Sequence, residues 1–71
     1  MNIDEFCIAL ARRFPKHAEE VAAWKPDYRT ALSAPDLDIA ESLRVTLARW
    51  TKSFPPKPGE IDRRRARSGD G

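Results

Sequence analysis

The chain has 71 residues, of which 41% are hydrophobic and 34% are charged, and its net charge is +2. This length allows one small domain, and the composition is that of a globular protein rather than a disordered one. One cysteine excludes an internal disulfide, and together with one histidine it is too little for a structural zinc site.

Targeting signals are also missing from the sequence. No apolar run approaches the ~20 residues of a membrane span. The first residues, MNIDEFC, carry acids where a signal peptide would carry bases. We therefore expect a cytoplasmic protein, which would lie in the cytoplasm of the bacterial host if a phage encodes it.

Residues 3–14 predict the first amphipathic helix. Asn2 and Glu5 have the spacing of a capping box, and Pro15 ends the segment. The apolar residues recur with a helical period and form one stripe: Ile3, Phe6, Cys7, Leu10 and Phe14.

Residues 16–32 predict a second helical segment with an interruption. Val21, Trp24, Tyr28 and Leu32 share one face of the helical period. Pro26 lies within this pattern, and the residue before a proline avoids the helical region. We therefore expect a break near Lys25.

Residues 33–50 give the strongest helical pattern. Ser33, Asp36 or Asp38 could cap this helix. Leu37 and Val45 fall outside the main stripe, so they are either scattered surface residues or a second contact face. The stripe itself consists of Ile39, Ala40, Leu43, Leu47 and Trp50, continued by Phe54.

A proline-rich corner follows the third helix. A residue before proline is pushed to an extended conformation, so the helix should end at Phe54. Pro58 suits the first turn of a short C-terminal helix. Phe54 and Ile61 are the apolar residues expected to pack that helix on the bundle. The corner comprises Phe54, Pro55, Pro56, Pro58, Glu60 and Ile61.

Together these segments predict an all-α fold, a small bundle of three main helices plus a short C-terminal helix. Residues 1–62 should form the domain, and residues 63–71 a basic, frayed tail. The expected core contains Phe6, Leu10, Phe14, Val21, Trp24, Ile39, Leu43, Leu47 and Trp50.

The sequence contains no nucleophile-base spacing and no glycine-rich phosphate loop, so we expect neither catalysis nor a bound cofactor or metal. Residues 1–55 hold eight basic and eight acidic side chains, and residues 56–71 hold five and three. The dense cluster of Arg63, Arg64, Arg65 and Arg67 predicts at most a weak, salt-sensitive, sequence-independent contact with nucleic acid. A protein-binding module is the favoured class, since small helical domains without a site commonly present a face to a partner.

Trp24, the third helix and the stretch KSFPPKPGEI together resemble the phage family of replicative-helicase loaders and inhibitors. The small helical N-terminal domain of that family carries a late Phe-Pro-Pro-x-x-x-Glu-Ile signature, matched here by Phe54, Pro55, Pro56, Glu60 and Ile61. Lambdoid P-type replication proteins are similar in this corner. The resemblance implies a non-enzymatic DNA-replication accessory module that binds a DnaB-type replicative helicase as loader, inhibitor or both.

The chain departs from that family at its end. In the family the helicase contact is ascribed largely to a flexible C-terminal extension, whereas residues 63–71 are a short basic tail. Either the natural chain is longer or it binds differently. Candidate contact residues are Leu37, Val45, Arg63, Arg64, Arg65 and Arg67. The alternative function is a small helical adaptor for nucleic acid or another host protein.

Overall fold

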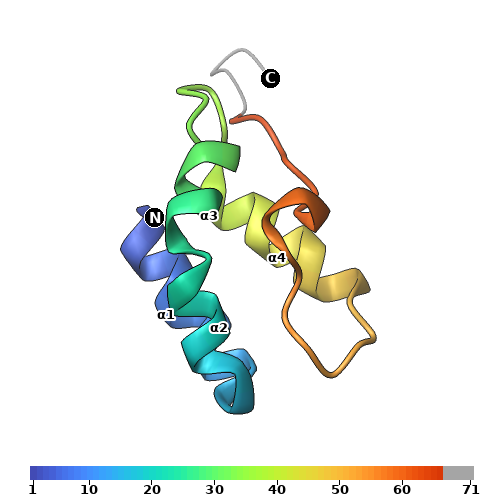
Figure 1. Cartoon of the computed structure of the whole chain (residues 1–71). Coiled ribbons are helices and arrows are strands. Elements are labelled where there is room, and N and C mark those ends of the chain that lie inside the picture. Colours follow the sequence, from blue (N-terminus) through green and yellow to red (C-terminus); the bar gives the residue numbers. More distant parts are fainter. Residues whose placement is uncertain (67–71) are drawn as a thin grey trace.

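The structure is a computed structural model that describes residues 1–66. Within this range it contains four α-helices, two 3-10 turns and no strand (Figure 1). The helices are α1 (Ile3–Arg13), α2 (Ala18–Ala23), α3 (Lys25–Ala31) and α4 (Ile39–Arg49), and the turns are η1 (Pro15–His17) and η2 (Pro58–Glu60). The all-α prediction is confirmed. None of the helices in this part of the chain has the length and apolar content that a bilayer crossing requires.

Local signals fix both ends of α1. The side chain of Asn2 accepts a hydrogen bond from the backbone N–H of Glu5 at 2.8 Å, and the Glu5 carboxylate accepts one from the Asn2 N–H at 3.0 Å. This capping box satisfies two N–H groups that the helix leaves open. Phe14, which precedes Pro15, leaves the helix with φ −127° and ψ 69°.

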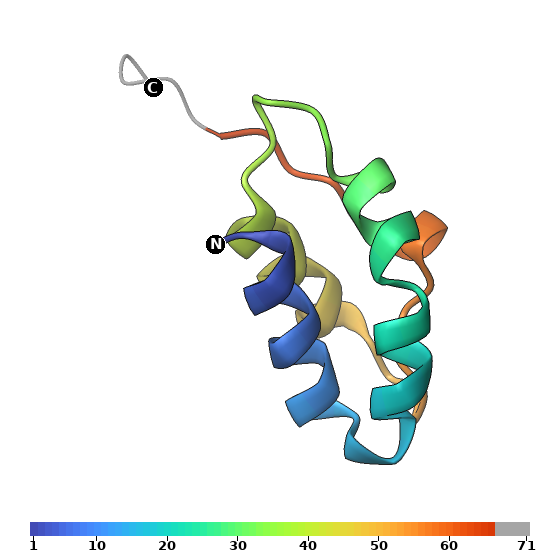
Figure 2. The ribbon, with the colours of Figure 1, turned by 60° about the vertical axis from the view of Figure 1, so that its left-hand side comes forward.

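The predicted break near Lys25 lies at Trp24, between α2 and α3. Trp24 has φ −87° and ψ 0°, a conformation that bends the chain without reversing it. Pro26 lies in the first turn of α3, where its missing N–H costs no helical hydrogen bond. As a result α2 and α3 return side by side with α1, as Figure 2 shows.

Tyr28 on α3 is the centre of the core. Its ring is fully buried, and its centroid lies 5.1 Å from that of Phe6 and 6.4 Å from that of Trp24. Of the predicted core, Trp24, Ile39, Leu47 and Trp50 are only partly buried and pack against its edge. The buried apolar residues are Phe6, Cys7, Leu10, Phe14, Val21, Tyr28, Leu32, Leu43 and Ile61.

The proline corner packs against the bundle through Ile61, as expected, but Pro55 and Pro56 take the place expected for Phe54. Pro55 and Pro56 are fully buried and Ile61 is 6% exposed, whereas Phe54 is 40% exposed. The Tyr28 hydroxyl donates a hydrogen bond to the Pro56 carbonyl. Burial raises the pKa of Tyr28, so this hydroxyl keeps its proton. Because a proline has no backbone N–H, burying Pro55 and Pro56 leaves no donor without a hydrogen-bond partner. The expected packing of Phe54 is therefore wrong.

The predicted C-terminal helix is also corrected. It is a single 3-10 turn, η2, and residues 61–66 that follow it are extended. These residues run beside α4 and the loop before it (Figure 1). Their N–H groups bond to side chains of α4 and to the loop rather than to carbonyls four residues back. Leu37 in that loop packs against the core, so it is not a free surface residue.

Candidate functional site

Residues 61–66, here called the arginine segment, are attached to α4 through two buried hydroxyls. The Asp62 N–H donates to Thr46 Oγ1 at 2.9 Å, and the Arg64 N–H donates to Ser42 Oγ at 2.8 Å. Residues two apart in an extended chain are ~6.6 Å apart, and residues four apart in a helix rise by ~6 Å. The two spacings match, so Ser42 and Thr46 form a ladder of acceptors for this segment.

The other edge of the arginine segment pairs with the loop before α4. The Asp38 N–H donates to the Arg64 carbonyl at 2.8 Å, and the Ala66 N–H donates to the Asp36 carbonyl at 2.6 Å. Leu37 and Arg65 form an isolated antiparallel bridge between these bonds. The expectation of a frayed tail is therefore wrong for residues 63–66, because backbone partners hold them. Arg67 and the residues after it lie outside the described part.

Two of the three arginines in this segment form ion pairs, and the Asp62 carboxylate also lies 3.6 Å from Arg49. Arg64 pairs with Asp62 at 2.9 Å, and Arg65 pairs with Asp36 at 3.3 Å. Arg63 is exposed and forms no ion pair within residues 1–66. Arg63, Arg64 and Arg65 therefore present less unpaired positive charge than the sequence indicates.

The remaining off-stripe candidate, Val45, lies beside this segment. It is partly buried and lines a hollow on α4 together with Arg44, Arg64 and Arg65. Glu41 from the preceding turn of α4 pairs with Arg44. Of the two off-stripe candidates, Leu37 packs against the core, whereas Val45 faces this hollow, so its role as a contact residue stays a prediction.

The clearest exposed feature is a corner patch formed by Trp50, Lys52 and Phe54. The Trp50 indole N–H donates to the Phe54 carbonyl at 2.6 Å, and the two rings meet edge to face with centroids 6.2 Å apart. The Lys52 ammonium lies 5.0 Å from the Trp50 centroid and 5.5 Å from the Phe54 centroid. These contacts hold a partly exposed phenylalanine in a fixed position beside a cation.

A basic groove adjoins this patch and shares Lys52 with it. The groove has a volume of about 250 Å³ and is formed by the end of α1, turn η1 and the loop after α4. The Arg13 guanidinium lies 5.1 Å from the centroid of Phe14, which supplies part of the apolar wall. The lining contains no carboxylate: Arg13, Phe14, Pro15, Lys16, His17, Lys52 and Ser53.

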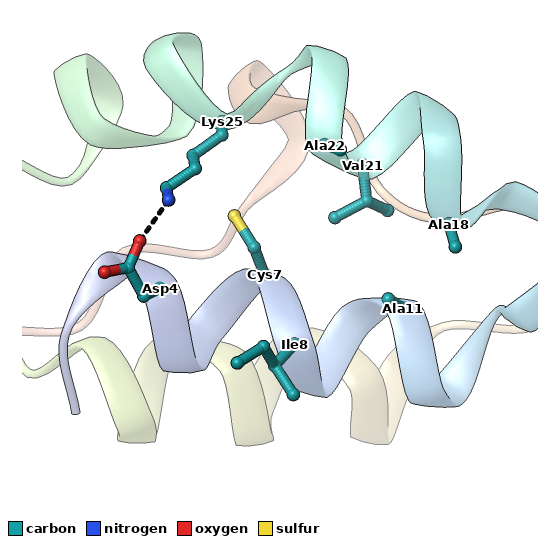
Figure 3. Close-up of a pocket in the computed structure, with 8 residues that line it drawn as sticks. All are labelled: Asp4, Cys7, Ile8, Ala11, Ala18, Val21, Ala22 and Lys25. Carbon is teal, nitrogen blue, oxygen red and sulfur yellow. Dashed lines mark ion pairs between the residues drawn. The ribbon is translucent and has the colours of Figure 1, made fainter.

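Another hollow, of about 410 Å³, lies between α1 and α2 (Figure 3). Asp4 and Lys25 form an ion pair at one end of it. The hydrogen bond and the charge of Lys25 lower the pKa of Asp4, and burial raises the pKa of Cys7. A protonated thiol and a neutralised carboxylate make a poor nucleophile and a poor base. The apolar wall consists of Cys7, Ile8, Ala11, Ala18, Val21 and Ala22.

Metal ligands do not gather anywhere in the described residues, where no group of three or more His, Cys, Asp or Glu side chains could hold an ion. At the surface, Nδ1 of His17 lies 2.9 Å from Oε1 of Glu20. The candidate site of this domain is therefore the corner patch with its basic groove.

Sequence reasoning missed the basic groove because its cations come from two stretches that lie far apart in the sequence, residues 13–17 and residues 52–53. Arg13, Lys16 and Lys52 do not form a run in the sequence. It also missed Ser42 and Thr46, which lie four residues apart on one face of α4. Two hydroxyls at helical spacing within an apolar stripe were the signal that could have shown this attachment.

Comparisons with protein-family models, with curated proteins and with solved structures each find no match to this chain.

Proposed function

We propose that this domain is a non-enzymatic protein-binding module that contacts its partner through the corner patch. The observation that carries the proposal is the 40% exposure of Phe54 beside Trp50, with Lys52 over both rings. A large aromatic residue at the surface, held in one conformation, is the usual anchor of a protein interface. The patch costs little ordering entropy on binding because its hydrogen bond and ring contacts already exist.

The resemblance of the corner supports a DnaB-type replicative helicase as the partner. Of the residues that carry this resemblance, Pro55, Pro56 and Ile61 are buried and hold the corner in place. Phe54 and Glu60 are the two that remain exposed to a partner. In this proposal the module acts stoichiometrically: it binds the helicase, restrains it or delivers it to DNA, and is released. Any nucleotide turnover belongs to the helicase.

A titration with purified helicase tests this proposal. We expect a defined complex, and we expect Phe54→Ala to weaken it by about 30-fold or more, the loss typical of an interface anchor. Ile8→Ala is the matched control, because Ile8 is a 52% exposed apolar residue that lies outside the corner patch and the basic groove. Far-UV circular dichroism should show that both variants remain folded.

Two results would contradict the proposal. If no complex forms with the helicase of the natural host at low or high salt, well into the micromolar range, the proposed partner is wrong. If a complex forms and Ile8→Ala weakens it as much as Phe54→Ala, the corner patch is not the contact.

A further inference from the structure

We infer that the basic groove receives an acidic segment of the protein partner, next to an apolar side chain that packs on the corner patch. This inference rests on the proposed function, because it takes the patch to be a protein contact. It adds the chemistry of the segment that the module recognises: carboxylates flanking one aliphatic or aromatic residue.

The charge of the groove is the first argument. Arg13 and Lys16 have no ion pair within residues 1–66, and Lys52 has only a loose one, 3.9 Å from Glu60. No carboxylate lines the groove. The nearest carboxylates are those of Glu20, which contacts His17, and Glu60, so the lining itself is basic. Partners generally meet a basic surface with negative charge.

The position of Lys52 is the second argument. It lines the groove, and its ammonium lies over the rings of Trp50 and Phe54. Lys52 therefore belongs both to the corner patch and to the basic groove. A partner segment that places a hydrophobic residue on Phe54 brings its neighbouring residues to Lys52 and the groove.

The helix dipole makes the side chains of the groove decisive. The groove lies at the C-terminal end of α1, where the helix presents carbonyl oxygens and negative partial charge. The backbone therefore opposes an anion, and only the side chains attract it. Reversing the charges of Arg13 and Lys16 should therefore replace two of the three lysine and arginine cations that attract an anion and leave only Lys52.

Single-stranded nucleic acid fits this surface less well. Binding of bases requires open aromatic faces on which they can stack. The Lys52 ammonium occupies a position over both rings of the patch, and Trp50 and Phe54 meet edge to face rather than forming a platform. The apolar groove wall from Phe14 and Pro15 also suits a peptide better than a phosphate backbone.

The indole signals of the chain provide a direct readout by ¹⁵N-resolved NMR. The chain has two tryptophans. Trp50 belongs to the corner patch, whereas Trp24 packs against Tyr28. The probe is a short synthetic peptide in which glutamates flank a leucine. We expect it to shift the Trp50 indole and the amides of residues 13–17 and 52–54, and to leave the Trp24 indole unchanged. An analogue with lysines in place of the glutamates should not bind.

Charge-reversed variants test the groove itself. Arg13→Glu with Lys16→Glu should weaken peptide binding about tenfold or more, the equivalent of two lost ion pairs. The matched control, Arg63→Glu with Arg65→Glu, makes the same change of charge in the arginine segment and should leave binding unchanged. Arg13 and Lys16 are exposed, so the spectrum of the variant should remain that of the folded domain. Binding of the peptide should also weaken as salt is raised.

Three results would overturn the inference: equal binding of the lysine analogue, no loss with the groove variant, or a single-stranded oligonucleotide that binds the same residues more tightly than the peptide. The outcome stays separate from that of the proposed function. A helicase complex that depends on Phe54 but tolerates Arg13→Glu with Lys16→Glu would overturn only the inference. Peptide binding without a helicase complex would overturn only the proposed partner.

Discussion

The molecule has two basic regions, and the one that dominates the sequence is the less available in the structure. In the arginine segment, Arg64 and Arg65 pair with Asp62 and Asp36, and the backbone is held on both edges. In the basic groove, Arg13 and Lys16 come from the end of α1 and from η1 and have no acidic neighbour in the lining. A run of like charges in a sequence therefore does not locate the free charge of the fold.

The largest test of this comparison removes the arginine segment. A chain that ends at Glu60 loses the burial of Ile61 and both bonds to the hydroxyls of α4. We expect a loss of about 3–6 kcal/mol, comparable to the whole stability of so small a domain. Urea denaturation followed by circular dichroism measures this loss. The control chain ends at Ala66 and keeps every contact described above. If both chains unfold at the same urea concentration, the segment is not structural.

A finer test leaves the segment in place and removes one of its acceptors. Thr46→Val keeps the shape of the side chain and leaves the Asp62 N–H without its partner. We expect a loss of about 1–3 kcal/mol in the free energy of unfolding. Thr51→Val is the control because Thr51 is exposed. Equal urea midpoints for the two variants would mean that the bond from Asp62 to Thr46 does not stabilise the fold.

The corner patch should respond in the opposite way, with a small effect on stability and a large effect on binding. Phe54→Ala should cost only about 1–2 kcal/mol, below the range of about 3–5 kcal/mol for a fully buried phenylalanine. Ile61→Ala, a few residues later and 6% exposed, should cost more, about 2–5 kcal/mol. Thermal or urea unfolding of the two variants gives the order. The reverse order would place Phe54 in the core after all.

The smallest expected effect is on the arginines themselves. The Arg65 side chain is 82% exposed and Asp36 is 54% exposed, so solvent screens their pair. Arg65→Ala should change the free energy of unfolding by no more than about 0.5 kcal/mol. It should also leave binding of the acidic peptide unchanged, whereas Arg13→Ala should reduce that binding at equal stability. Parallel titrations of the two variants provide the comparison.

The predictable part of this fold is the part that depends on near neighbours in the chain. Asn2 and Glu5 act within one turn, and Pro26 fits a helix only in its first turn, so the start of α1 and a break close to Pro26 could be read from the sequence. The residue before the proline, Lys25, is itself helical, and the break lies one residue earlier, at Trp24. The extended arginine segment could not, because its partners Ser42 and Thr46 are more than a dozen residues away and polar. The sequence after Pro58 predicts a short helix with hydrogen bonds between its own backbone groups. In the structure the N–H groups of Asp62 and Arg64 bond instead to the hydroxyls of Thr46 and Ser42.

The candidate site was harder to predict than the fold for a related reason. The Tyr28 hydroxyl bonds the Pro56 carbonyl, Pro55 and Pro56 are buried, and Phe54 is left 40% exposed. Apolar periodicity assigns Phe54 to the core stripe because it takes no account of the two prolines that follow it. The basic groove needs residues 13–17 and 52–53 to meet, and no local sequence pattern shows that they do.

The hydroxyl ladder on α4 also has a consequence for the order in which the domain can form during synthesis. Residues 61–66 leave the ribosome after all four helices, and translation adds about 5–20 residues each second. Until they emerge, the hydroxyls of Ser42 and Thr46 lack the N–H donors of Arg64 and Asp62, and the Pro56 carbonyl that Tyr28 bonds emerges only shortly before these residues. The four helices therefore emerge before the segment that completes their packing. The burial of Ile61 and the two bonds to α4 can form only after residues 61–66 have left the ribosome.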